Sequence, residues 1–327
     1  MEGETMANED KRTWAEIDLD RLYHNYREVR RVLPEGCRFA GLCKANAYGH
    51  GAELISKELN RMGVRSFCVA TVSEGVQLRQ RHIKGEILIL GYTHPEQFPL
   101  LRKYRLTQTV VDSSYAQLLN AGGRKLQVHL KIDTGMHRLG ERAEHIDELC
   151  GVFRCKNLVV TGTYTHLCCA DSTSAADQAF TAQQVSTFDQ VVSALEQRGY
   201  SCGKVHTLAS CGLLHYPEFA GDYARVGIAL YGVLSERAAL EGCLITLRPV
   251  LSLKARVALV KDLYAGESAG YGLQHVAQRD QKIAVLTIGY ADGLPRALSC
   301  GRGRVLIHGA EAPIIGRVCM DQTLVDV

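Results

Sequence analysis

Short apolar runs alternate with longer amphipathic stretches along the first two thirds of the chain. The apolar runs, which have the length and β-branched content of strands, are Arg38–Ala45, Ser66–Val72, Glu86–Tyr92, Leu106–Asp112, Leu126–Asp133, Asn157–His166, Lys204–Ser210 and Tyr223–Gly232. The amphipathic stretches between them are Ala52–Met62, Ser73–Arg81, Glu96–Tyr104, Ser114–Ala121, Arg142–Val152 and Asp177–Arg198, followed by the short Cys211–Tyr216. This alternation predicts an α/β fold, a (β/α)8 barrel of the TIM type, with a doubly wound open sheet as the alternative.

The pattern changes after Gly232. Ser235–Gly242 is typical of a polar connection, and from Leu247 onward short strands and glycine turns follow one another without an amphipathic helix. The expected strands are Leu251–Val260, Glu267–Gly270, Lys282–Gly289, Gly303–Ile307 and Thr323–Val327. We therefore predict a tail or linker at 1–12, a barrel at 13–244 and an all-β C-terminal domain at 245–327. Because the chain ends within a strand pattern, we expect that domain to be C-terminally truncated.

Composition narrows the class of protein. A hydrophobic content of 46%, with 22% charged residues, is that of an ordinary globular chain, and a net charge of +3 without a basic cluster argues against nucleic-acid binding. The 12 cysteines include no Cys-x-x-Cys, which favours a reducing, cytoplasmic compartment, and we interpret Cys168-Cys169 as two small buried residues. No apolar run approaches the ~18 residues of a membrane span, so we expect no membrane segment in this chain.

Candidate chemistry lies at the C-terminal ends of the predicted strands, where barrel enzymes place their active sites. In chain order these residues are Lys44, Lys131 followed by Arg138, His166, Ser210 and Arg225. Lys44 lies in the apolar run Gly41–Ala45, and burial of an ammonium group favours the neutral amine that forms imines. Taken alone, such a lysine is more often a structural residue at a strand end.

Glycines near these positions add a second signal. Tyr48-Gly49-His50-Gly51 predicts a tight loop that leads into a helix, Ser210-Cys211-Gly212 precedes another helix, and Gly227 follows Arg225. Free backbone N–H groups at glycine turns and helix starts bind phosphate. Each of these signals is weak by itself, because most such glycines only make turns.

Taken together and in order, seven segments resemble the alanine racemase family. They are Lys44–Gly51 (KANAYGHG), Lys131–Gly140 (KIDTGMHRLG), Thr165-His166, Arg225–Gly232 (RVGIALYG), Gly270–Gly272 (GYG), Ile288–Gly293 (IGYADG) and Gly316–Gln322 (GRVCMDQ). The resemblance runs from about Thr13 to the end of the chain. Tyr223–Leu234 and Pro249–Arg256 are further similar to the serine-racemising branch associated with vancomycin resistance.

The resemblance implies a pyridoxal-phosphate (PLP) enzyme that racemises alanine or serine and supplies D-amino acids for cell-wall precursors. Lys44 would hold the cofactor as a Schiff base and act as the base on one face of the substrate Cα. Tyr271 of the partner subunit in a homodimer would be the base on the other face. Two opposed bases suit racemisation, because a proton leaves one face and another arrives at the opposite face.

The family also implies roles for the other residues. The cofactor would contact Tyr48, His166, Ser210, Arg225, Gly227 and Ile228: Arg225 at the pyridine nitrogen, His166 against Tyr271, and the rest at the phosphate. Arg138 and the backbone N–H of Met320 would meet the substrate carboxylate, and Tyr290 would line the entrance. Lys131, which is carbamylated in some relatives, would position Arg138.

Three departures from the family pattern stand out. Ala209 replaces an asparagine common before the serine, and His137 replaces the usual glycine and adds bulk beside Arg138. Relatives continue for several tens of residues past the Met320 motif, and that part includes a position that helps to separate alanine from serine. In the branch named above, a membrane domain precedes the racemase domain, so the native protein is expected to be tethered through a preceding segment.

Two other functions compete with racemisation. A barrel-type PLP decarboxylase would place a carboxylate, rather than Arg225, at the ring nitrogen. A non-catalytic PLP-binding protein shares the barrel but typically lacks the β domain that carries Tyr271, Tyr290 and Met320.

Overall fold

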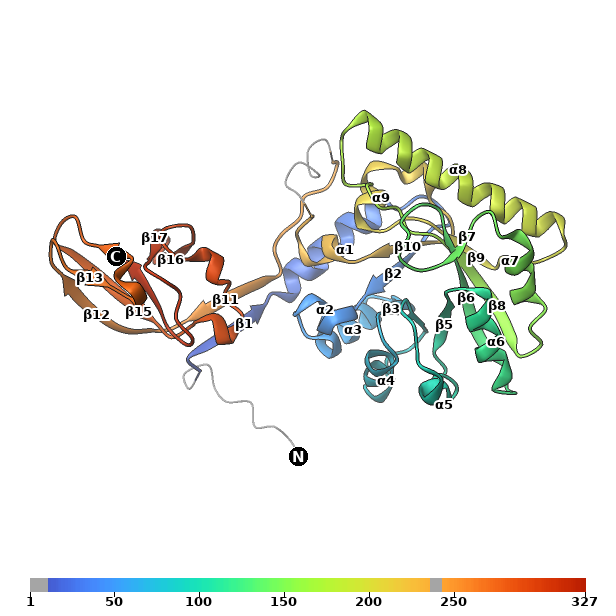
Figure 1. Cartoon of the computed structure of the whole chain (residues 1–327), viewed down its shortest axis with the longest axis horizontal. Helices are drawn as coiled ribbons and strands as arrows, with labels where there is room; N and C mark the ends of the chain where they lie inside the picture. The colour runs from blue at the N-terminus through green and yellow to red at the C-terminus, as the bar shows by residue number, and fades with distance from the viewer. Residues whose placement is uncertain (1–10, 236–242) are drawn as a thin grey trace. The chain divides into compact units, whose positions relative to one another are not determined.

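The computed structural model describes residues 11–235 and 243–327, which form two compact units (Figure 1). One unit spans Asp18–Val250, and the other combines Leu251–Val327 with the residues up to Ile17. The predicted tail at 1–12 lies outside the described residues except for its last two. The predicted connection Ser235–Gly242 lies outside them except for Ser235.

The first strand corrects the predicted start of the barrel domain. β1 (Thr13–Ile17) pairs antiparallel with β11 (Leu251–Ala255). Arg12, which we had assigned to the tail, donates to the carbonyl oxygen of Thr287 at 2.8 Å. Residues 12–17 therefore belong to the β-rich unit and not to the barrel. A pairing between the two ends of the chain leaves no trace in a local hydrophobic pattern.

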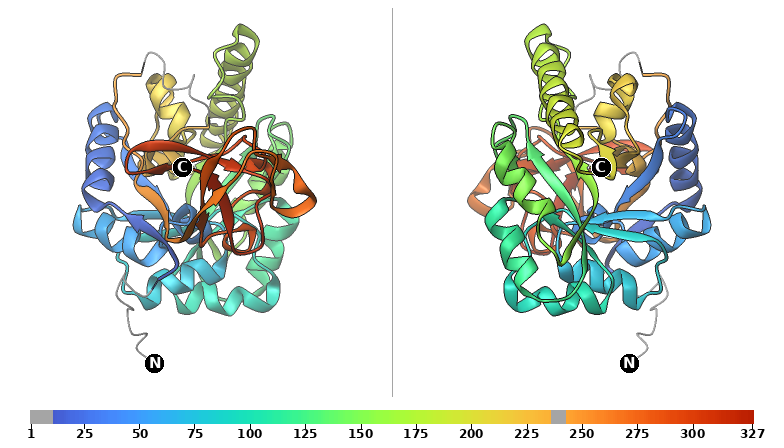
Figure 2. Two further views of the ribbon diagram at one scale, coloured as in Figure 1. Left: turned by 90° about the vertical axis from the view of Figure 1, so that its left-hand side faces the viewer. Right: turned by 90° about the vertical axis from the view of Figure 1, so that its right-hand side faces the viewer.

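Eight parallel strands of the Asp18–Val250 unit form a nearly closed barrel surrounded by helices, as predicted (Figures 1 and 2). In order of adjacency they are β10 (Tyr223–Val226), β2 (Arg38–Leu42), β3 (Ser66–Val69), β4 (Glu86–Ile89), β5 (Thr107–Val110), β6 (Leu126–Asp133), β8 (Leu158–Tyr164) and β9 (Lys204–His206). A parallel bridge between Ala209 and Arg225 joins the two ends, and β7 (Glu141–Arg142) adds to β6. Each barrel strand lies within a predicted apolar run, because strands covered on both faces are apolar along their whole length.

The helices of this unit also follow the predicted pattern, with one long addition and several short ones. They are α1 (Leu19–Val32), α2 (Lys44–Tyr48), α3 (Ala52–Arg61), α4 (Val72–Gln80), η2 (Pro95–Gln97), α5 (Phe98–Lys103), α6 (Ser113–Ala121), α7 (Ile146–Phe153), α8 (Ala175–Gln197), α9 (Ser210–His215), η3 (Pro217–Phe219) and η4 (Ile228–Tyr231). In the part of the chain that the structure describes, no helix combines the length and the apolar character needed to cross a bilayer.

The long additional helix is α1, which the sequence analysis did not anticipate. Its buried residues Leu22, Asn25 and Val29 recur at helical spacing on one face among charged positions, so the helix is amphipathic although few of its residues are apolar. Asn25 is fully buried and donates to the carbonyl oxygens of Leu230 at 3.1 Å and Arg248 at 2.8 Å. A polar side chain thus fixes α1 against the segment that follows the last barrel strand.

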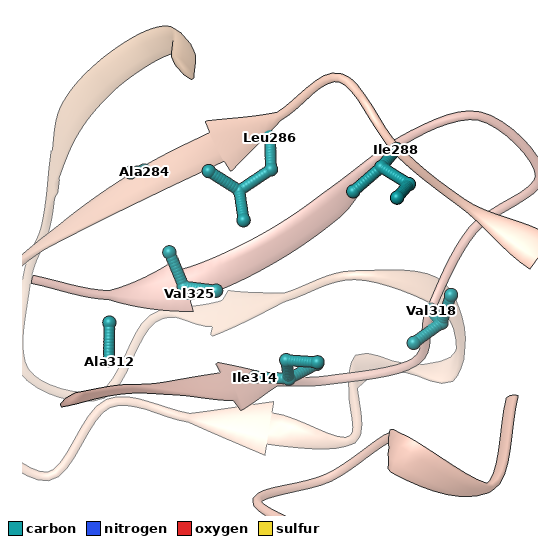
Figure 3. Packing of buried hydrophobic residues seen from close by; sticks show 7 residues of the cluster. All are labelled: Ala284, Leu286, Ile288, Ala312, Ile314, Val318 and Val325. Carbon is teal, nitrogen blue, oxygen red and sulfur yellow. The ribbon is translucent and has the colours of Figure 1, made fainter. Parts of the chain in front are cut away.

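The β-rich unit is an antiparallel sheet, as predicted for the C-terminal part. Its strands lie in the order β12 (Val257–Leu263), β15 (Gln281–Leu286), β18 (Thr323–Asp326), β17 (Ala310–Ile315) and β16 (Arg304–Ile307). The strands β13 (Ser268–Ala269) and β14 (His275–Val276) form a separate two-stranded sheet between β12 and β15 in the sequence. Its main core consists of Ala284, Leu286, Ile288, Ala312, Ile314, Val318 and Val325 (Figure 3).

One strand of this sheet, β17, was missing from the prediction. It contains Pro313, which lacks the N–H that a strand normally donates and so argues against a strand in a sequence pattern. The signal that could have identified it is the pair His308-Gly309, which joins β16 to β17 with φ angles of 50° and 83°. Two consecutive residues of positive φ are typical of a tight hairpin turn.

Candidate active site

One cavity at the C-terminal ends of the barrel strands is lined by the residues that we had assigned to the cofactor. It has a volume of about 260 Å³ and is open on one side. Among its lining residues are Lys44, Tyr48, His166, Ser210, Arg225, Gly227 and Ile228. The barrel brings them together because parallel strands all end at the same face.

Lys44 stands at the start of a turn of left-handed backbone. The next four residues, Ala45–Tyr48, have φ angles between 51° and 55°, and Gly49 follows with a φ of 86°. We had predicted only a tight loop here. Left-handed backbone costs an L-residue roughly 1–2 kcal/mol, so other contacts must hold the turn, and such strain is typical of functional sites.

Two side chains supply those contacts. Glu74 accepts hydrogen bonds from the N–H of Ala45 and from the N–H of Ala70, both at 2.7 Å, through different carboxylate oxygens. Asn46 Oδ1 accepts from the N–H of Ala52 at 2.9 Å and ties the turn to the first residue of α3. Hydrogen bonds from both sides therefore hold the turn that follows Lys44.

Tyr48 lies between Lys44 and Gly227. Lys44 Nζ is 5.8 Å from the centre of the Tyr48 ring. A Cβ atom on Gly227 would lie 2.6 Å from the Tyr48 hydroxyl oxygen, so only glycine leaves room for that hydroxyl. Burial raises the pKa of Tyr48 to about 12. Its hydroxyl therefore stays protonated and can donate to a ligand.

Ser210 links the two glycine-containing segments of the cavity. Its Oγ accepts from the N–H of Gly227 at 3.0 Å and from the N–H of Ala229 at 3.4 Å. Because the hydroxyl oxygen is the acceptor in both bonds, the Ser210 proton remains to be donated. α9 begins at Ser210 and η4 at Ile228, and the first N–H groups of a helix have no partner within it. This wall of the cavity suits an anion.

Arg225 is buried, with only 3% of its surface exposed, and its guanidinium is held by backbone oxygens. Nη2 donates to the carbonyl oxygens of Thr165 and Thr207, each at 2.8 Å. Nη1 donates to the carbonyl oxygen of His206 at 3.1 Å and lies 2.6 Å from Nδ1 of that ring. Because a guanidinium carries no acceptor, Nδ1 of His206 must be the unprotonated nitrogen. The orientation of Arg225 is thereby fixed.

His166 lies beside Arg225, with its Nδ1 3.3 Å from Nη2. Burial, followed by the nearby charges of Arg225 and Lys131, lowers the pKa of His166 to about 3. The imidazole is therefore neutral at physiological pH and offers one donor and one acceptor.

Lys131 lies on β6 and Arg138 in the loop after it; neither lines the cavity, but the charges of both contribute to the low pKa of His166. Lys131 is buried, whereas Arg138 is exposed. Burial, followed by the charges of Arg138 and Arg225, lowers the pKa of Lys131 to about 8. His137 has a φ of 52° at the position where relatives carry glycine. Its backbone is therefore strained in a conformation that glycine adopts without steric cost. Its N–H donates to Asp133 Oδ1 at 3.0 Å.

The other three predicted residues lie in the β-rich unit. Tyr271 begins η6 (Tyr271–Leu273) and Tyr290 begins η7 (Tyr290–Asp292), while Met320 precedes β18. All three side chains are exposed, Tyr271 at 70%. The N–H of Ala291 donates to the carbonyl oxygen of Met320 at 2.8 Å, which places the Tyr290 and Met320 loops side by side. That these residues meet Lys44 in one site stays a prediction.

Two residues that hold Arg225 were missed in the sequence. The rings of His206 and Tyr164 stack with centres 4.8 Å apart and an interplanar angle of 4°, and the Arg225 guanidinium lies 5.1 Å from the Tyr164 ring centre. The available signal was the presence of polar and aromatic residues within otherwise apolar strands. It is weak, because a lone histidine in a strand is usually a structural residue.

The cavity fits PLP in the chemistry of its walls. Lys44 supplies a primary amine for the cofactor aldehyde. Tyr48 and Ser210 supply hydroxyl donors for a phosphate, in a cradle that a Cβ at position 227 would fill. Arg225 supplies a fixed donor for the ring nitrogen.

Comparison with protein families and curated sequences gives a consistent result. The alanine racemase N-terminal domain matches residues 17–235, and the alanine racemase C-terminal domain matches residues 250–327. The chain is 42% identical to an amino-acid racemase of Enterococcus faecalis, a match that covers 97% of the chain and 44% of the relative. It is 38% identical to a serine/alanine racemase of Enterococcus gallinarum, covering 97% of the chain and 45% of that relative. The chain thus spans about half the length of these curated relatives.

Shorter relatives and solved structures are covered more completely. An alanine racemase of Carboxydothermus hydrogenoformans is 41% identical over 96% of the chain and 85% of its own length. The structure of the alanine racemase of Clostridium difficile 630 superposes with a TM-score of 0.89 at 33% identity, covering 97% of this chain and 83% of that one. The chain belongs to the alanine racemase family, whose members depend on PLP.

Proposed function

We propose that this chain racemises a small amino acid, alanine or serine, with PLP bound in the barrel cavity. The observation that carries the proposal is the convergence of Lys44, the anchored Arg225 and the Tyr48–Ser210–Gly227 cradle on one cavity. Bound PLP withdraws electrons from the substrate amine and so acidifies the Cα–H bond. The protein must bind the substrate, move the protons and exclude side reactions.

Two bases on opposite faces would move the protons. Lys44 serves one face, and Tyr271 of the partner subunit serves the other. A phenol is a poor base at neutral pH unless its neighbours favour the phenolate. His166 supports this role, because its low pKa keeps it neutral and its Nδ1 faces the Arg225 guanidinium. The ring proton is then on Nε2, which can donate to the tyrosine oxygen and favour the phenolate.

Arg225 would control the strength of the electron withdrawal. A guanidinium stays protonated and donates a hydrogen bond without giving up its proton. Arg225 in this position would leave the ring nitrogen of bound PLP unprotonated and weaken its electron withdrawal, which would disfavour side reactions such as transamination. This arginine also argues against decarboxylation as the function, since we expect a carboxylate at that position in PLP-barrel decarboxylases.

The remaining residues would bind the two anionic groups. Tyr48, Ser210, Gly227 and Ile228 hold the cofactor phosphate. Arg138 and the Met320 N–H hold the substrate carboxylate, and Tyr290 lines the entrance. Lys131 positions Arg138, and its pKa of about 8 leaves part of the amine neutral at physiological pH, which is the form that carbon dioxide carbamylates.

Sharing of Tyr271 requires a homodimer with two equivalent sites. The β-rich unit has exposed apolar side chains that suit an interface, among them Leu259, Val260, Tyr271 and Leu273. Such an enzyme would act in the cytoplasm, in keeping with 12 cysteines that form no Cys-x-x-Cys pattern. It would supply D-amino acids for cell-wall precursors, and we place it in the vancomycin-resistance branch.

The test is racemisation by the purified, PLP-loaded chain. Cofactor attached to Lys44 should give an absorbance band at about 420 nm, and circular dichroism should follow the loss of optical activity of L-alanine and L-serine. Lys44→Ala should abolish both signals. A chain with the absorbance band that racemises neither amino acid would overturn the proposal in favour of a non-catalytic PLP-binding protein.

A further inference from the structure

A continuous row of polar side chains crosses the interior of the barrel, where apolar packing is the rule. It starts at Arg225 on β10, passes through His206 on β9 and His129 on β6, and ends at Glu86, the first residue of β4. The two imidazoles are 1% and 0% exposed, and Glu86 is 15% exposed at its side chain. None of these residues except Arg225 has a role in the function proposed above.

The first two contacts of the row fix the tautomers of both histidines. Arg225 Nη1 donates to Nδ1 of His206, so the proton of that ring is on Nε2. Nε2 of His206 lies 3.0 Å from Nδ1 of His129 and must donate to it. The proton of His129 is therefore also on Nε2, which faces away from His206. Every donor in the row points from Arg225 toward Glu86.

Glu86 is the acceptor at the end of the row. His129 Nε2 and Glu86 Oε1 lie 3.2 Å apart, although the N–H is not aimed directly at the oxygen. No other acceptor among the described residues reaches this buried nitrogen. An unsatisfied buried N–H costs about 1–3 kcal/mol, so a small rotation that aligns the Glu86 carboxylate with this N–H is favoured.

Other groups keep this carboxylate ionised. Lys204 Nζ lies 3.4 Å from Oε2, and the Tyr223 hydroxyl donates to the same oxygen at 3.2 Å. Thr107 Oγ1 lies 3.5 Å from Oε1. Although burial works in the opposite direction, His129, Lys204 and Tyr223 lower the pKa of Glu86 to about 2. A permanent negative charge thus stands at one end of the row and a permanent positive charge at the other.

We propose that Glu86 is a positioning residue for Arg225 and acts on it through His129 and His206, which relay the carboxylate charge as neutral, polarised imidazoles. Chains of hydrogen bonds strengthen one another in a medium of low dielectric constant. The relay holds the guanidinium in one orientation and partly balances the positive charges of Lys44, Lys131 and Arg138, which surround His166. Only the link from Arg225 to the cofactor ring rests on the proposed function.

The row itself can be tested on the cofactor-free wild-type chain. Nitrogen-15 NMR of the imidazole rings distinguishes the two neutral tautomers and the charged form. We expect the proton of both rings to be on Nε2, and we expect His206 to stay neutral between pH 5 and pH 9, since burial and Arg225 hold the pKa of His206 well below its usual value. A proton on Nδ1 of either ring, or titration of His206 in this range, would overturn the relay whether or not the chain is a racemase.

The role of Glu86 is tested by Glu86→Gln, which keeps the shape of the side chain and removes its charge. The Nε2–H signal of His129 should lose its carboxylate-bonded shift, and the Nε2 signal of His206, which Glu86 does not touch, should move as well. In the PLP-loaded enzyme kcat should fall about tenfold, the equivalent of one charged hydrogen bond, while KM changes less than twofold. An unchanged His206 signal with unchanged kcat would contradict the proposal.

Thr163→Val is the matched control. Thr163 is fully buried on β8 and donates to the carbonyl oxygen of Cys202 at 2.9 Å, so this variant loses a buried hydrogen bond without touching the row. It should lower the melting temperature and leave the imidazole signals and kcat unchanged. If Thr163→Val shifts the His206 signal as much as Glu86→Gln does, Glu86 contributes only general stability and the relay is wrong. A wild-type chain that fails to racemise would refute the proposed function and leave the tautomer result standing.

Discussion

Lys131 is a buried amine among cations, and this gives the protein a specific dependence on pH. Its pKa falls from 10.5 in the unfolded chain to about 8 in the folded protein, first through burial and then through Arg138 and Arg225. Between these two values the folded state has released a proton that the unfolded state still holds, so stability rises with pH in this window. We therefore expect the free energy of unfolding of the wild type to increase, relative to that of Lys131→Met, as the pH rises from 8 to 10.

The size of this gain has an upper bound of a few kcal/mol, since one pKa unit corresponds to about 1.4 kcal/mol. Urea unfolding of both proteins, in buffers free of carbon dioxide so that the amine stays unmodified, measures it. Taking the difference between the two proteins cancels the titration of the other lysines. A constant difference across pH 8 to pH 10 would mean that Lys131 is not buried as a free amine.

Individual site residues were predictable where the type of side chain and its position at the end of a strand indicate its chemistry. Lys44, His166, Ser210 and Arg225 stand at strand ends and line the cavity, as expected from a barrel. The residues that orient them were not predictable. Glu74 reaches Ala45 across 29 positions of sequence, a contact that only the folded chain creates.

The left-handed turn Ala45–Tyr48 yields a prediction about backbone strain. Ala45 is exposed and has a φ of 51°, so Ala45→Gly removes a steric cost of roughly 1–2 kcal/mol from the folded state. Against this, glycine loses more conformational entropy on folding, which costs about 0.5–1 kcal/mol. We expect a net stabilisation of up to about 1 kcal/mol in the cofactor-free protein, measured as a higher urea midpoint.

The same substitution in a right-handed helix provides the control. Ala182 is exposed within α8, and Ala182→Gly should destabilise by about 1 kcal/mol, the opposite sign. Equal destabilisation by both substitutions would mean that Ala45 is not held in left-handed backbone in solution.

Most elements with a clear hydrophobic period were predicted correctly. The eight barrel strands follow from apolar runs, because each is covered on both faces. α1 was missed although its buried residues recur at helical spacing, and β17 was missed because it contains a proline. The left-handed turn after Lys44 contains three non-glycine residues before Tyr48, so sequence rules that reserve positive φ for glycine could not reveal it.

The division into two units involves both ends of the chain. β1 pairs with β11 about 240 positions later, so the β-rich unit cannot be completed until most of the chain is present. The boundary predicted at residue 13 failed for this reason, and the β-rich unit resumes at Leu251 where the prediction had residue 245. A local hydrophobic period does not show which strands pair when they are far apart in the sequence.

The proposed sharing of sites between subunits makes a quantitative prediction. Lys44→Ala and Tyr271→Ala should each abolish racemisation when pure. In a dimer that combines one of each, one site has both defects and the other has Lys44 of one subunit and Tyr271 of its partner intact. Random mixing makes half of the dimers hybrid, so about a quarter of the wild-type rate should return if Tyr271 acts on the partner's cofactor.

The experiment unfolds the two variants together and refolds them with PLP before the circular-dichroism assay. Each variant refolded alone is the blank, and refolded wild type sets the full rate. If Tyr271 acted within its own subunit, every site in the hybrid would lack either Lys44 or Tyr271, and no activity would return at any mixing ratio. Sedimentation must show dimers in the mixture, so that absence of recovery counts against the shared site and not against assembly.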